Sequence, residues 1–237
     1  MDIVEVRCTD GRSLRLKVKD VIYKGSSPSQ KIAIYDTEEF GRCLFLDGVI
    51  QSSEKDHDIY DEAMLRELRA SDSDLLILGG GDGYIAKKAL TLNPDINITI
   101  VDLDEEVVRI CKEYLSQQVF NDSHVKVVIK DALEFVCNAD SNSFDGLISD
   151  LTDFPVGYDN RMVELFSNIF ERAGIILRQK GWISLYGGVK GLKAANNERV
   201  VDLLGDILKR YFHNTECSEV LIPSFGEPCY FLYGKRE

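Results

Sequence analysis

Apolar residues between positions 75 and 185 gather in short runs that alternate with amphipathic segments of helical spacing. The apolar runs have the length of buried strands and occupy residues 75–78, 96–101, 125–129, 146–149 and 182–185. The amphipathic segments follow the first four runs at residues 84–92, 105–115, 132–137 and 162–178. This alternation predicts an α/β fold of the Rossmann-like, doubly wound type, with helices on both faces of a mostly parallel sheet. Ligands of such folds bind at the carboxyl ends of the strands.

The first 70 residues have a different pattern, in which short β-rich segments are separated by turn residues. Strands are expected at residues 13–18, 30–35 and 42–46, with an Asp47-Gly48 hairpin turn before residues 49–51. A helix at 58–69 follows, and its expected apolar face consists of Ile59, Ala63, Leu65 and Leu68. We therefore expect a small N-terminal antiparallel β domain at 1–70 and a Rossmann-like domain at 71–237. A closing antiparallel pair is expected at 219–222 and 230–233.

The chain is acidic, with 40 Asp and Glu residues against 28 Lys and Arg residues and a formal net charge of -12. Such a charge repels nucleic acid, so a nucleic-acid partner is not expected, and it attracts polyvalent cations. An enzyme that is acidic only for solubility would show the same balance. The net charge therefore argues against a nucleic-acid partner, but it does not by itself identify a cationic ligand.

The apolar runs and the cysteines of the chain indicate the cellular compartment in which the protein is found. No apolar run approaches the roughly 18 residues that span a bilayer, and MDIVEVRCTDGR lacks the apolar stretch of a signal peptide, so we expect no membrane association and a cytoplasmic protein. The six cysteines contain no C-x-x-C pair, which argues against a zinc knuckle and a disulfide framework. We expect free and mostly buried thiols.

A glycine-rich loop, GGGDG at residues 79–83, lies between the first predicted strand and the helix that follows it. Glycines such as Gly79 and Gly81 allow a tight turn and a close approach to a ligand. Asp82 stands inside this loop, where its charge would repel the pyrophosphate of a dinucleotide. A ligand with a positive charge and no phosphate fits better, and S-adenosyl sulfonium compounds meet both conditions.

Three more carboxylates follow the next three predicted strands. Asp102 lies where such folds bind ribose hydroxyls, or it caps a helix, although Asp104 is the more natural cap. Asp131 is a candidate for the adenine amino group or for a helix cap. Asp150 should face the same cleft as Asp82, and such clustered acids indicate a metal site or an amine substrate. No histidine accompanies them, so we expect no metal.

Four motifs occur in order along the chain: GGGDG (79–83), VDLDEEVV (101–108), KDALEF (130–135) and SDLTDFP (149–155). Two longer segments accompany them, SPSQKIAIYDTEEFGRCLFLDGVIQSSEKDHDIYDEAM (27–64) and LIPSFGEPCYFLYGK (221–235). Together they resemble the spermidine/spermine synthases, which are polyamine aminopropyltransferases, over nearly the whole chain. The resemblance is closest to the catalytic region of spermine synthase. It implies a transferase that uses decarboxylated S-adenosylmethionine as co-substrate, with no cofactor, and it makes a homodimer an expectation.

The resemblance also implies roles for particular residues. Asp150 matches the family's proton acceptor. The implied donor-binding residues are Gln30, Gly79, Gly81, Asp82, Asp102, Asp131 and Ala132. The implied acceptor-binding residues are Tyr60, Asp82, Asp153, Phe225 and Glu227. Two positions depart from the family. The family usually has Glu where this chain has Asp102, whose shorter side chain reaches less far toward the ribose. It usually has Tyr where this chain has Phe225, which lacks the hydroxyl.

The identity of the acceptor amine rests on features of two subfamilies. Leu151, Thr152 and Pro155 follow the spermine synthase pattern, and Glu227 would supply the further anion that a triamine needs. We therefore expect spermidine as acceptor, with spermine and methylthioadenosine as products. Asp153 matches the acid that spermidine synthases use for putrescine, which is the alternative. Glu227 would otherwise be a solvated loop acid.

The sequence is compatible with two other functions. A methyltransferase that uses S-adenosylmethionine would share the fold, but Asp82 would repel the carboxylate of that donor. An inactive polyamine-binding relative would not need Gln30, Tyr60, Asp82 and Asp150 together. His57 is interpreted as a solvated loop residue.

Overall fold

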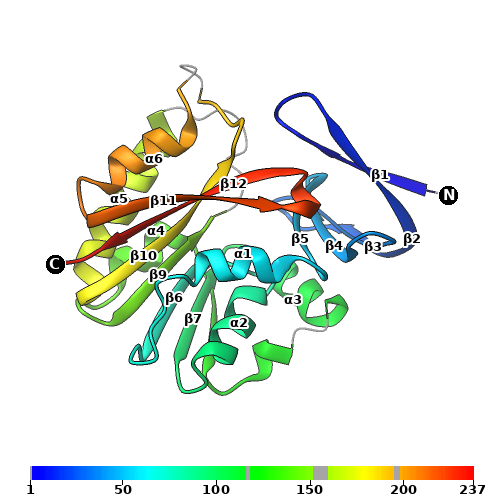
Figure 1. Cartoon of the computed structure of the whole chain (residues 1–237). Coiled ribbons are helices and arrows are strands. Elements are labelled where there is room, and N and C mark those ends of the chain that lie inside the picture. The colour runs from blue at the N-terminus through cyan, green and yellow to red at the C-terminus, as the bar shows by residue number, and fades with distance from the viewer. Residues whose placement is uncertain (1, 116–117, 152–159, 195–197) are drawn as a thin grey trace.

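The computed structural model of this protein describes residues 2–115, 118–151, 160–194 and 198–237, which form two β-sheets with helices (Figure 1). The first sheet is antiparallel, with its five strands in chain order. These strands are β1 (Asp2–Arg7), β2 (Ser13–Ser26), β3 (Lys31–Thr37), β4 (Gly41–Leu46) and β5 (Val49–Ser53). The expected Asp47-Gly48 turn is present, because both residues have positive φ, 48° and 85°, between the paired Leu46 and Val49.

The second sheet has seven strands in the order β11-β12-β10-β9-β6-β7-β8. Five of them run parallel: β6 (Asp74–Gly79), β7 (Asn97–Asp102), β8 (Val125–Ile129), β9 (Phe144–Asp150) and β10 (Leu177–Val189). The closing hairpin, β11 (His213–Ile222) and β12 (Glu227–Lys235), adds antiparallel strands at one edge. The predicted mostly parallel, Rossmann-like sheet with a small antiparallel β domain before it is therefore confirmed.

Helices cover both faces of the seven-stranded sheet (Figure 1). On one face lie α4 (Ala132–Asn138), α5 (Asn160–Ile176) and α6 (Val200–Leu208). On the other lie α1 (His57–Met64) and α2 (Tyr84–Leu92), while α3 (Glu105–Tyr114) packs against the N-terminal sheet. Short 3-10 turns occupy Gln118–Asn121 (η1) and Pro223–Phe225 (η2).

Some elements differ from the sequence-based expectation. The helix expected at 58–69 ends at Met64, and Ile59, placed on its apolar face, is 38% exposed. The helix expected to reach residue 178 ends at Ile176, because Leu177 already pairs with Phe144 in the sheet. No prediction covered β1 or α6, although five buried apolar residues of α6 have helical spacing: Val200, Val201, Leu204, Ile207 and Leu208.

Both sheets are built around apolar cores. Trp182 is 1% exposed, and its Nε1 donates a hydrogen bond to Asp72 at 2.8 Å. Four of the six free cysteines are buried, as predicted.

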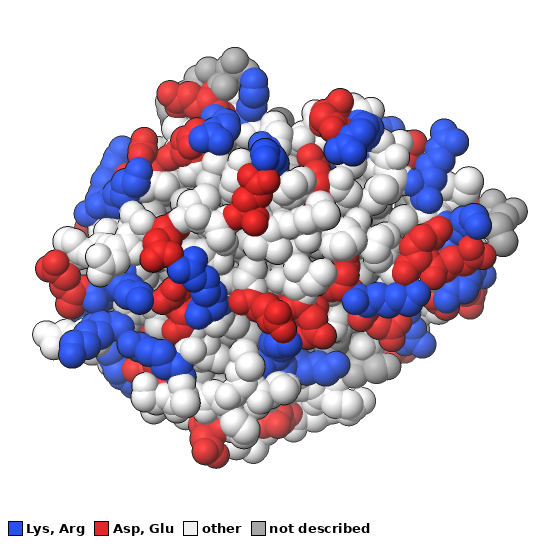
Figure 2. Space-filling model, in the orientation of Figure 1, with Lys and Arg blue, Asp and Glu red and all other residues white. Residues whose placement is uncertain are grey.

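On the face drawn in Figure 2, acidic and basic side chains are interspersed. Among the described residues, no helix has both the length and the apolar character that crossing a membrane requires.

Candidate active site

A pocket lies between the carboxyl end of the parallel sheet and the elements that close over it, namely the end of β5, α1 and η2. Its position is the one expected for ligands of doubly wound folds. Its lining contains these ionisable side chains: Asp56, His57, Tyr60, Asp61, Asp82 and Asp150. No Lys or Arg is found among the described residues of this lining, so the pocket favours a cation.

Asp150, at the carboxyl end of β9, accepts a hydrogen bond from the Tyr60 hydroxyl at 2.5 Å. Burial raises the pKa of Asp150 to about 7, the Tyr60 bond opposes this rise, and the charge of Asp82 adds to it. Tyr60 extends from α1 and packs edge-on against Phe231, with ring centroids 5.2 Å apart. The structure thus brings together two residues that are 90 positions apart. A carboxylate with a pKa near neutrality is suited to accept a proton at physiological pH.

Replacing Tyr60 by Phe should raise the pKa of Asp150, because the lost hydrogen bond stabilises the ionised carboxylate. Since the ionised form accepts the proton, the acid limb of the kcat/KM profile should move to higher pH. We expect about a tenfold loss of kcat/KM at pH 7. The measurement is a pH–rate profile of both proteins. A uniform loss at every pH would contradict this role for Tyr60.

Asp82 lies in the glycine-rich loop after β6 and lines the same pocket. Its Oδ1 accepts a hydrogen bond from the backbone of Tyr84 at 3.1 Å, and burial raises its pKa. The glycine-rich loop packs closely against Asp150 and Asp102. A Cβ atom added at Gly79 would lie 2.2 Å from the Asp150 carbonyl oxygen, and one added at Gly81 would lie 2.6 Å from Asp102 Oδ2, so neither position has room for a side chain. Any side chain at these positions would separate the loop from the acids.

Asp102 and Gln30 are brought close together through Asp104. Asp104 caps α3 by accepting hydrogen bonds from the backbone of Glu106 and Val107, so it is the cap, as expected. Gln30 Nε2 donates to Asp104 Oδ2 at 2.9 Å, while Asp102 accepts from the Asp104 backbone at 2.8 Å. Burial raises the pKa of Asp102. Ribose binding by Asp102 and donor binding by Gln30 stay predictions.

Asp131 follows β8, beside the strand that ends in Asp102. Its carboxylate accepts a hydrogen bond from the Glu134 backbone at 2.8 Å and caps α4. Ala132, the first residue of α4, is partly buried against the apolar core. The capping role proposed for Asp131 is therefore present, and an adenine contact by Asp131 or Ala132 stays a prediction.

Of the residues expected to bind the acceptor, Phe225 lines the pocket, with its ring 6.2 Å from that of Tyr60. Glu227 does not line the pocket, and it is not a solvated loop acid either, because it begins β12 and is 5% exposed. Both carboxylate oxygens of Glu227 accept hydrogen bonds from Thr9, from its backbone N at 3.0 Å and its Oγ1 at 2.6 Å. Asp153 lies outside the described residues.

Asp56 was not predicted, and it holds the Phe225 segment in place. This residue is 6% exposed and accepts hydrogen bonds from Ser224, from its backbone N at 2.7 Å and its Oγ at 2.9 Å. Ser53 Oγ also donates to it. Because Asp56 immediately precedes α1, these bonds fix η2 against the start of the helix and Phe225 beside Tyr60.

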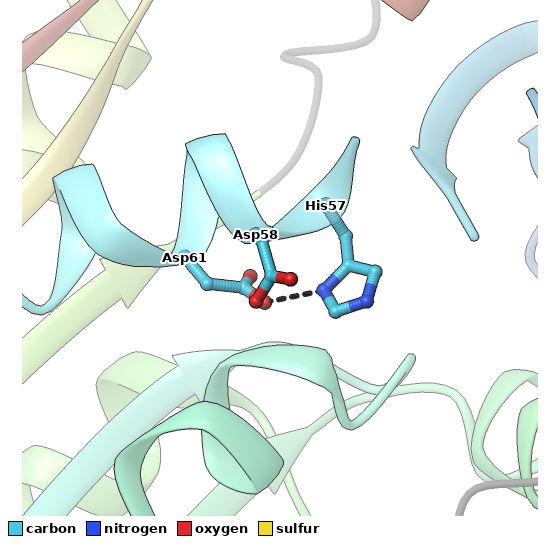
Figure 3. Close-up of side chains that lie close together, drawn as sticks. All are labelled: His57, Asp58 and Asp61. Carbon is cyan, nitrogen blue, oxygen red and sulfur yellow. Dashed lines mark hydrogen bonds and ion pairs between the residues drawn. The ribbon is translucent and has the colours of Figure 1, made fainter. Parts of the chain in front are cut away.

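The interpretation of His57 as a solvated loop residue was wrong. His57 begins α1, its side chain is 13% exposed, and its ring stacks on Tyr84 with centroids 3.8 Å apart. Its Nδ1 lies 2.7 Å from Asp61 Oδ2, and Figure 3 shows the two side chains meeting one turn apart. Burial raises the pKa of Asp61 to about 7. Sequence reasoning missed Asp61, although helical spacing places it on the same face as His57.

His57, Asp58 and Asp61 form a group whose ligand atoms lie within 4.8 Å of one another. Asp58 is exposed and is already paired with Lys88, whose Nζ lies 3.1 Å from its carboxylate. A fixed ammonium group at this position opposes a divalent cation. The group gives no reason to place a metal here, and the absence of a metal stays a prediction.

Two family models match the chain. The spermine/spermidine synthase domain matches residues 42–236, and the spermidine synthase tetramerisation domain matches residues 4–54. Polyamine aminopropyltransferase 1 of Hyperthermus butylicus is 35% identical over 204 residues, covering 76% of this chain and 70% of the relative. The polyamine aminopropyltransferase of Thermoanaerobacter pseudethanolicus is 32% identical over 236 residues, covering 94% and 79%.

Solved structures show the same fold. Spermidine synthase from Thermotoga maritima superimposes with a TM-score of 0.84 at 22% identity, covering 100% of this chain and 80% of that one. A spermidine synthase in complex with the transition state analogue AdoDATO gives a TM-score of 0.85, with the same identity and coverage.

Proposed function

Since this chain belongs to the spermine/spermidine synthase family and is a polyamine aminopropyltransferase, we propose that its acceptor is spermidine. It transfers an aminopropyl group from decarboxylated S-adenosylmethionine and releases spermine and methylthioadenosine. The observation that carries the proposal is the cation-favouring pocket, in which Asp150, Tyr60 and Asp82 come together. No cofactor takes part in this chemistry.

The proposed reaction is a displacement at the carbon next to the donor's sulfonium. Asp150 accepts a proton from the attacking ammonium, which frees the nitrogen lone pair to form the new N–C bond. The electrons of the broken C–S bond remain on sulfur, so methylthioadenosine leaves as a neutral thioether and needs no general acid. The remaining task of the protein is to align nitrogen, carbon and sulfur.

We assign the donor to the loop that follows β6 and to the neighbouring strand ends. Gly79 and Gly81 allow its close approach, and Asp82 binds its terminal ammonium. The methylthioadenosine part is assigned to Gln30, Asp102, Asp131 and Ala132. The Gln30–Asp104–Asp102 chain of hydrogen bonds supports this assignment, because it holds two of these side chains at one strand end.

We assign the acceptor to the side of the pocket formed by Tyr60 and Phe225, with Glu227 beyond them. Glu227 supports spermidine as acceptor because it is a buried carboxylate that, among the described residues, forms no ion pair. A carboxylate that accepts two hydrogen bonds from Thr9 keeps the capacity to accept more. It can therefore receive the distal ammonium of a triamine.

Replacing Glu227 by Gln should raise the KM for spermidine by about tenfold, because the charge is lost while the shape and the Thr9 contact are largely retained. The KM for the donor should not change. Glu219→Gln, at an exposed position of β11, is the matched control. An unchanged KM for spermidine would remove Glu227 from the acceptor site.

Mass spectrometry of the products tests the acceptor itself. The protein is incubated with either decarboxylated S-adenosylmethionine or S-adenosylmethionine, and with either putrescine or spermidine. Spermine from spermidine and the decarboxylated donor is expected. Spermidine formed from putrescine alone would overturn this choice and give Asp153 the deciding role. Methyl transfer from S-adenosylmethionine, or no methylthioadenosine with either amine, would instead support a methyltransferase or an inactive relative.

We also infer a cytoplasmic homodimer. The six free cysteines, of which Cys137 and Cys217 are exposed, are consistent with a reducing compartment. Light scattering of the purified protein measures the number of subunits in the oligomer. The family model that matches the N-terminal residues is named after a tetramer, and the finding of a tetramer would overturn the dimer.

A further inference from the structure

Asp104 links the two sheets of the protein beside the residues assigned to the donor. It lies between β7 and α3, and its side chain contacts the turn that joins β2 to β3 in the N-terminal sheet. Its backbone N donates to Asp102 Oδ1 at 2.8 Å. The residue is 7% exposed, and an acid so buried requires hydrogen-bond donors around its carboxylate.

The two carboxylate oxygens of Asp104 have different partners. Oδ1 accepts hydrogen bonds from the backbone of Glu106 at 3.1 Å and of Val107 at 3.4 Å, and these bonds cap α3. Oδ2 accepts from Ser27 Oγ at 2.6 Å and from Gln30 Nε2 at 2.9 Å. A helix cap needs one side-chain oxygen, and serine supplies it about as well as aspartate. Capping therefore does not explain the contacts of Oδ2.

The turn between β2 and β3 is fixed to Asp104 through Ser27 as well as through Gln30. Ser27 Oγ accepts hydrogen bonds from the backbone of Ser29 and of Gln30, both at 3.1 Å. The same hydroxyl donates to Asp104. The backbone N of Ser27 also donates to the carbonyl oxygen of Gln30 at 2.9 Å. Ser27 thus holds the backbone of Gln30, while Asp104 holds its side chain.

These contacts determine which end of the Gln30 amide faces a ligand. A carboxylate only accepts hydrogen bonds, so the amide must turn Nε2 toward Asp104 and cannot turn Oε1 toward it. No hydrogen bond to Gln30 Oε1 is present among the described residues. Oε1 can therefore accept a hydrogen bond from a ligand, such as one donated by a hydroxyl group.

We propose that Asp104 is a positioning residue for the donor, because its Oδ2 orients the Gln30 amide so that Oε1 accepts from a ribose hydroxyl. The proposal rests on the proposed assignment of Gln30 to the methylthioadenosine part of the donor. Asp104 acts through Gln30 and does not itself bind the substrate. The N-terminal sheet then takes part in donor binding, since the turn after β2 carries Gln30 to the end of β7.

Asp104→Ser separates the two functions of the carboxylate, because serine keeps a capping oxygen and lacks Oδ2. In isothermal titration calorimetry of the full chain, methylthioadenosine and decarboxylated S-adenosylmethionine should both bind about tenfold more weakly, since both carry the ribose. The midpoint of thermal unfolding should stay close to that of the unmodified protein. Asp104→Ala also removes the cap and should lower this midpoint by about 3 °C.

Glu105→Gln is the matched control, because it removes an exposed charge from the first turn of the same helix. It should leave both affinities unchanged. Steady-state kinetics add a measurement that a general loss of structure would not give. Asp104→Ser should raise the KM for the donor while kcat at saturating donor stays the same.

A double-mutant cycle with Gln30→Ala tests whether the effect of Asp104 passes through Gln30. Gln30→Ala alone should weaken methylthioadenosine binding by about tenfold, and the addition of Asp104→Ser should weaken it no further. Losses that multiply in the double variant would overturn the proposal, because Asp104 would then act on the ligand through its charge. An unchanged affinity of the Asp104→Ser protein would overturn it as well.

Ser27→Ala tests the same contact with Asp104 and the helix cap intact, so the proposal stays testable even if Asp104→Ser does not fold. The loss of the Ser27 hydroxyl should weaken methylthioadenosine binding about fivefold, and an unchanged affinity would contradict the proposal. The unmodified protein reports on the proposed function separately. If it bound no methylthioadenosine, the proposed function would fail, whereas normal binding that is insensitive to these variants would overturn only the role of Asp104.

Discussion

Replacing Asp150 by Asn should lower kcat by about 10²-fold or more, with little change in KM. Asn has nearly the same volume as Asp and can still contact Tyr60, but it cannot accept a proton from the attacking ammonium. Most amino groups of a polyamine are protonated at pH 7. The variant can therefore use only the small fraction of acceptor whose attacking amine is already neutral. The acid limb of the kcat/KM profile, which the Asp150 pKa of about 7 in the empty pocket places near neutrality, should therefore disappear.

The measurement is methylthioadenosine formation at saturating donor and a series of acceptor concentrations, which gives both kcat and kcat/KM, across pH 6 to 9, a range of roughly three units around useful carboxylate-base chemistry. The variant should regain part of its rate at high pH, where neutral amine becomes abundant. Asp140→Asn, an exposed acid in the loop before β9, is the matched control. Turnover equal to that of the unmodified protein at pH 7 would show that another group accepts the proton.

Replacing Asp82 by Asn should weaken the binding of decarboxylated S-adenosylmethionine by about 10²-fold, because it removes a partly buried charge that we assign to the binding of the donor ammonium. Binding of S-adenosylmethionine should weaken less or improve, since its carboxylate is no longer repelled. The preference between the two donors should therefore fall.

Calorimetric titration with both donors measures this preference, and methylthioadenosine binding shows whether the loop after β6 has kept its shape. Asp95→Asn changes an exposed acid between α2 and β7 and serves as the control. A variant with an unchanged ratio of the two donor affinities would show that charge at position 82 does not select the donor.

The main features of the fold were predictable because burial and secondary structure leave local patterns in the sequence. Apolar runs at 75–78 and 146–149 mark strands that are buried on both faces, and the parallel sheet confirms them. Acids that follow such strands must meet at one edge, so the proximity of Asp82 and Asp150 could also be predicted. The family resemblance supplied Tyr60, which joins this cluster from α1.

The inner face of α1 could not be predicted, because counting apolar residues at helical spacing placed Ile59 inward. In the structure Ile59 is 38% exposed while Asp61 is 1% exposed. The helix lines a polar pocket with His57, Tyr60 and Asp61, so the apolar pattern that marks a core-facing helix is interrupted here. A polar interruption of this kind is itself a signal of a site.

The environment of Glu227 was not predictable for a different reason. Its partner Thr9 is 218 positions away, in the connection between β1 and β2, and no local pattern records such a contact. Only the packing of the two sheets against each other brings these residues together (Figure 1).

The cluster of acids in the pocket couples catalysis to the acidity of the surroundings. Burial raises the pKa values of Asp61 and Asp150 to about 7, so a fall in pH below neutrality favours their protonated forms. An arriving ammonium favours their ionised forms and expels these protons. By linkage, substrate affinity then rises with pH through the neutral range. A fall in pH through this range is therefore expected to slow aminopropyl transfer.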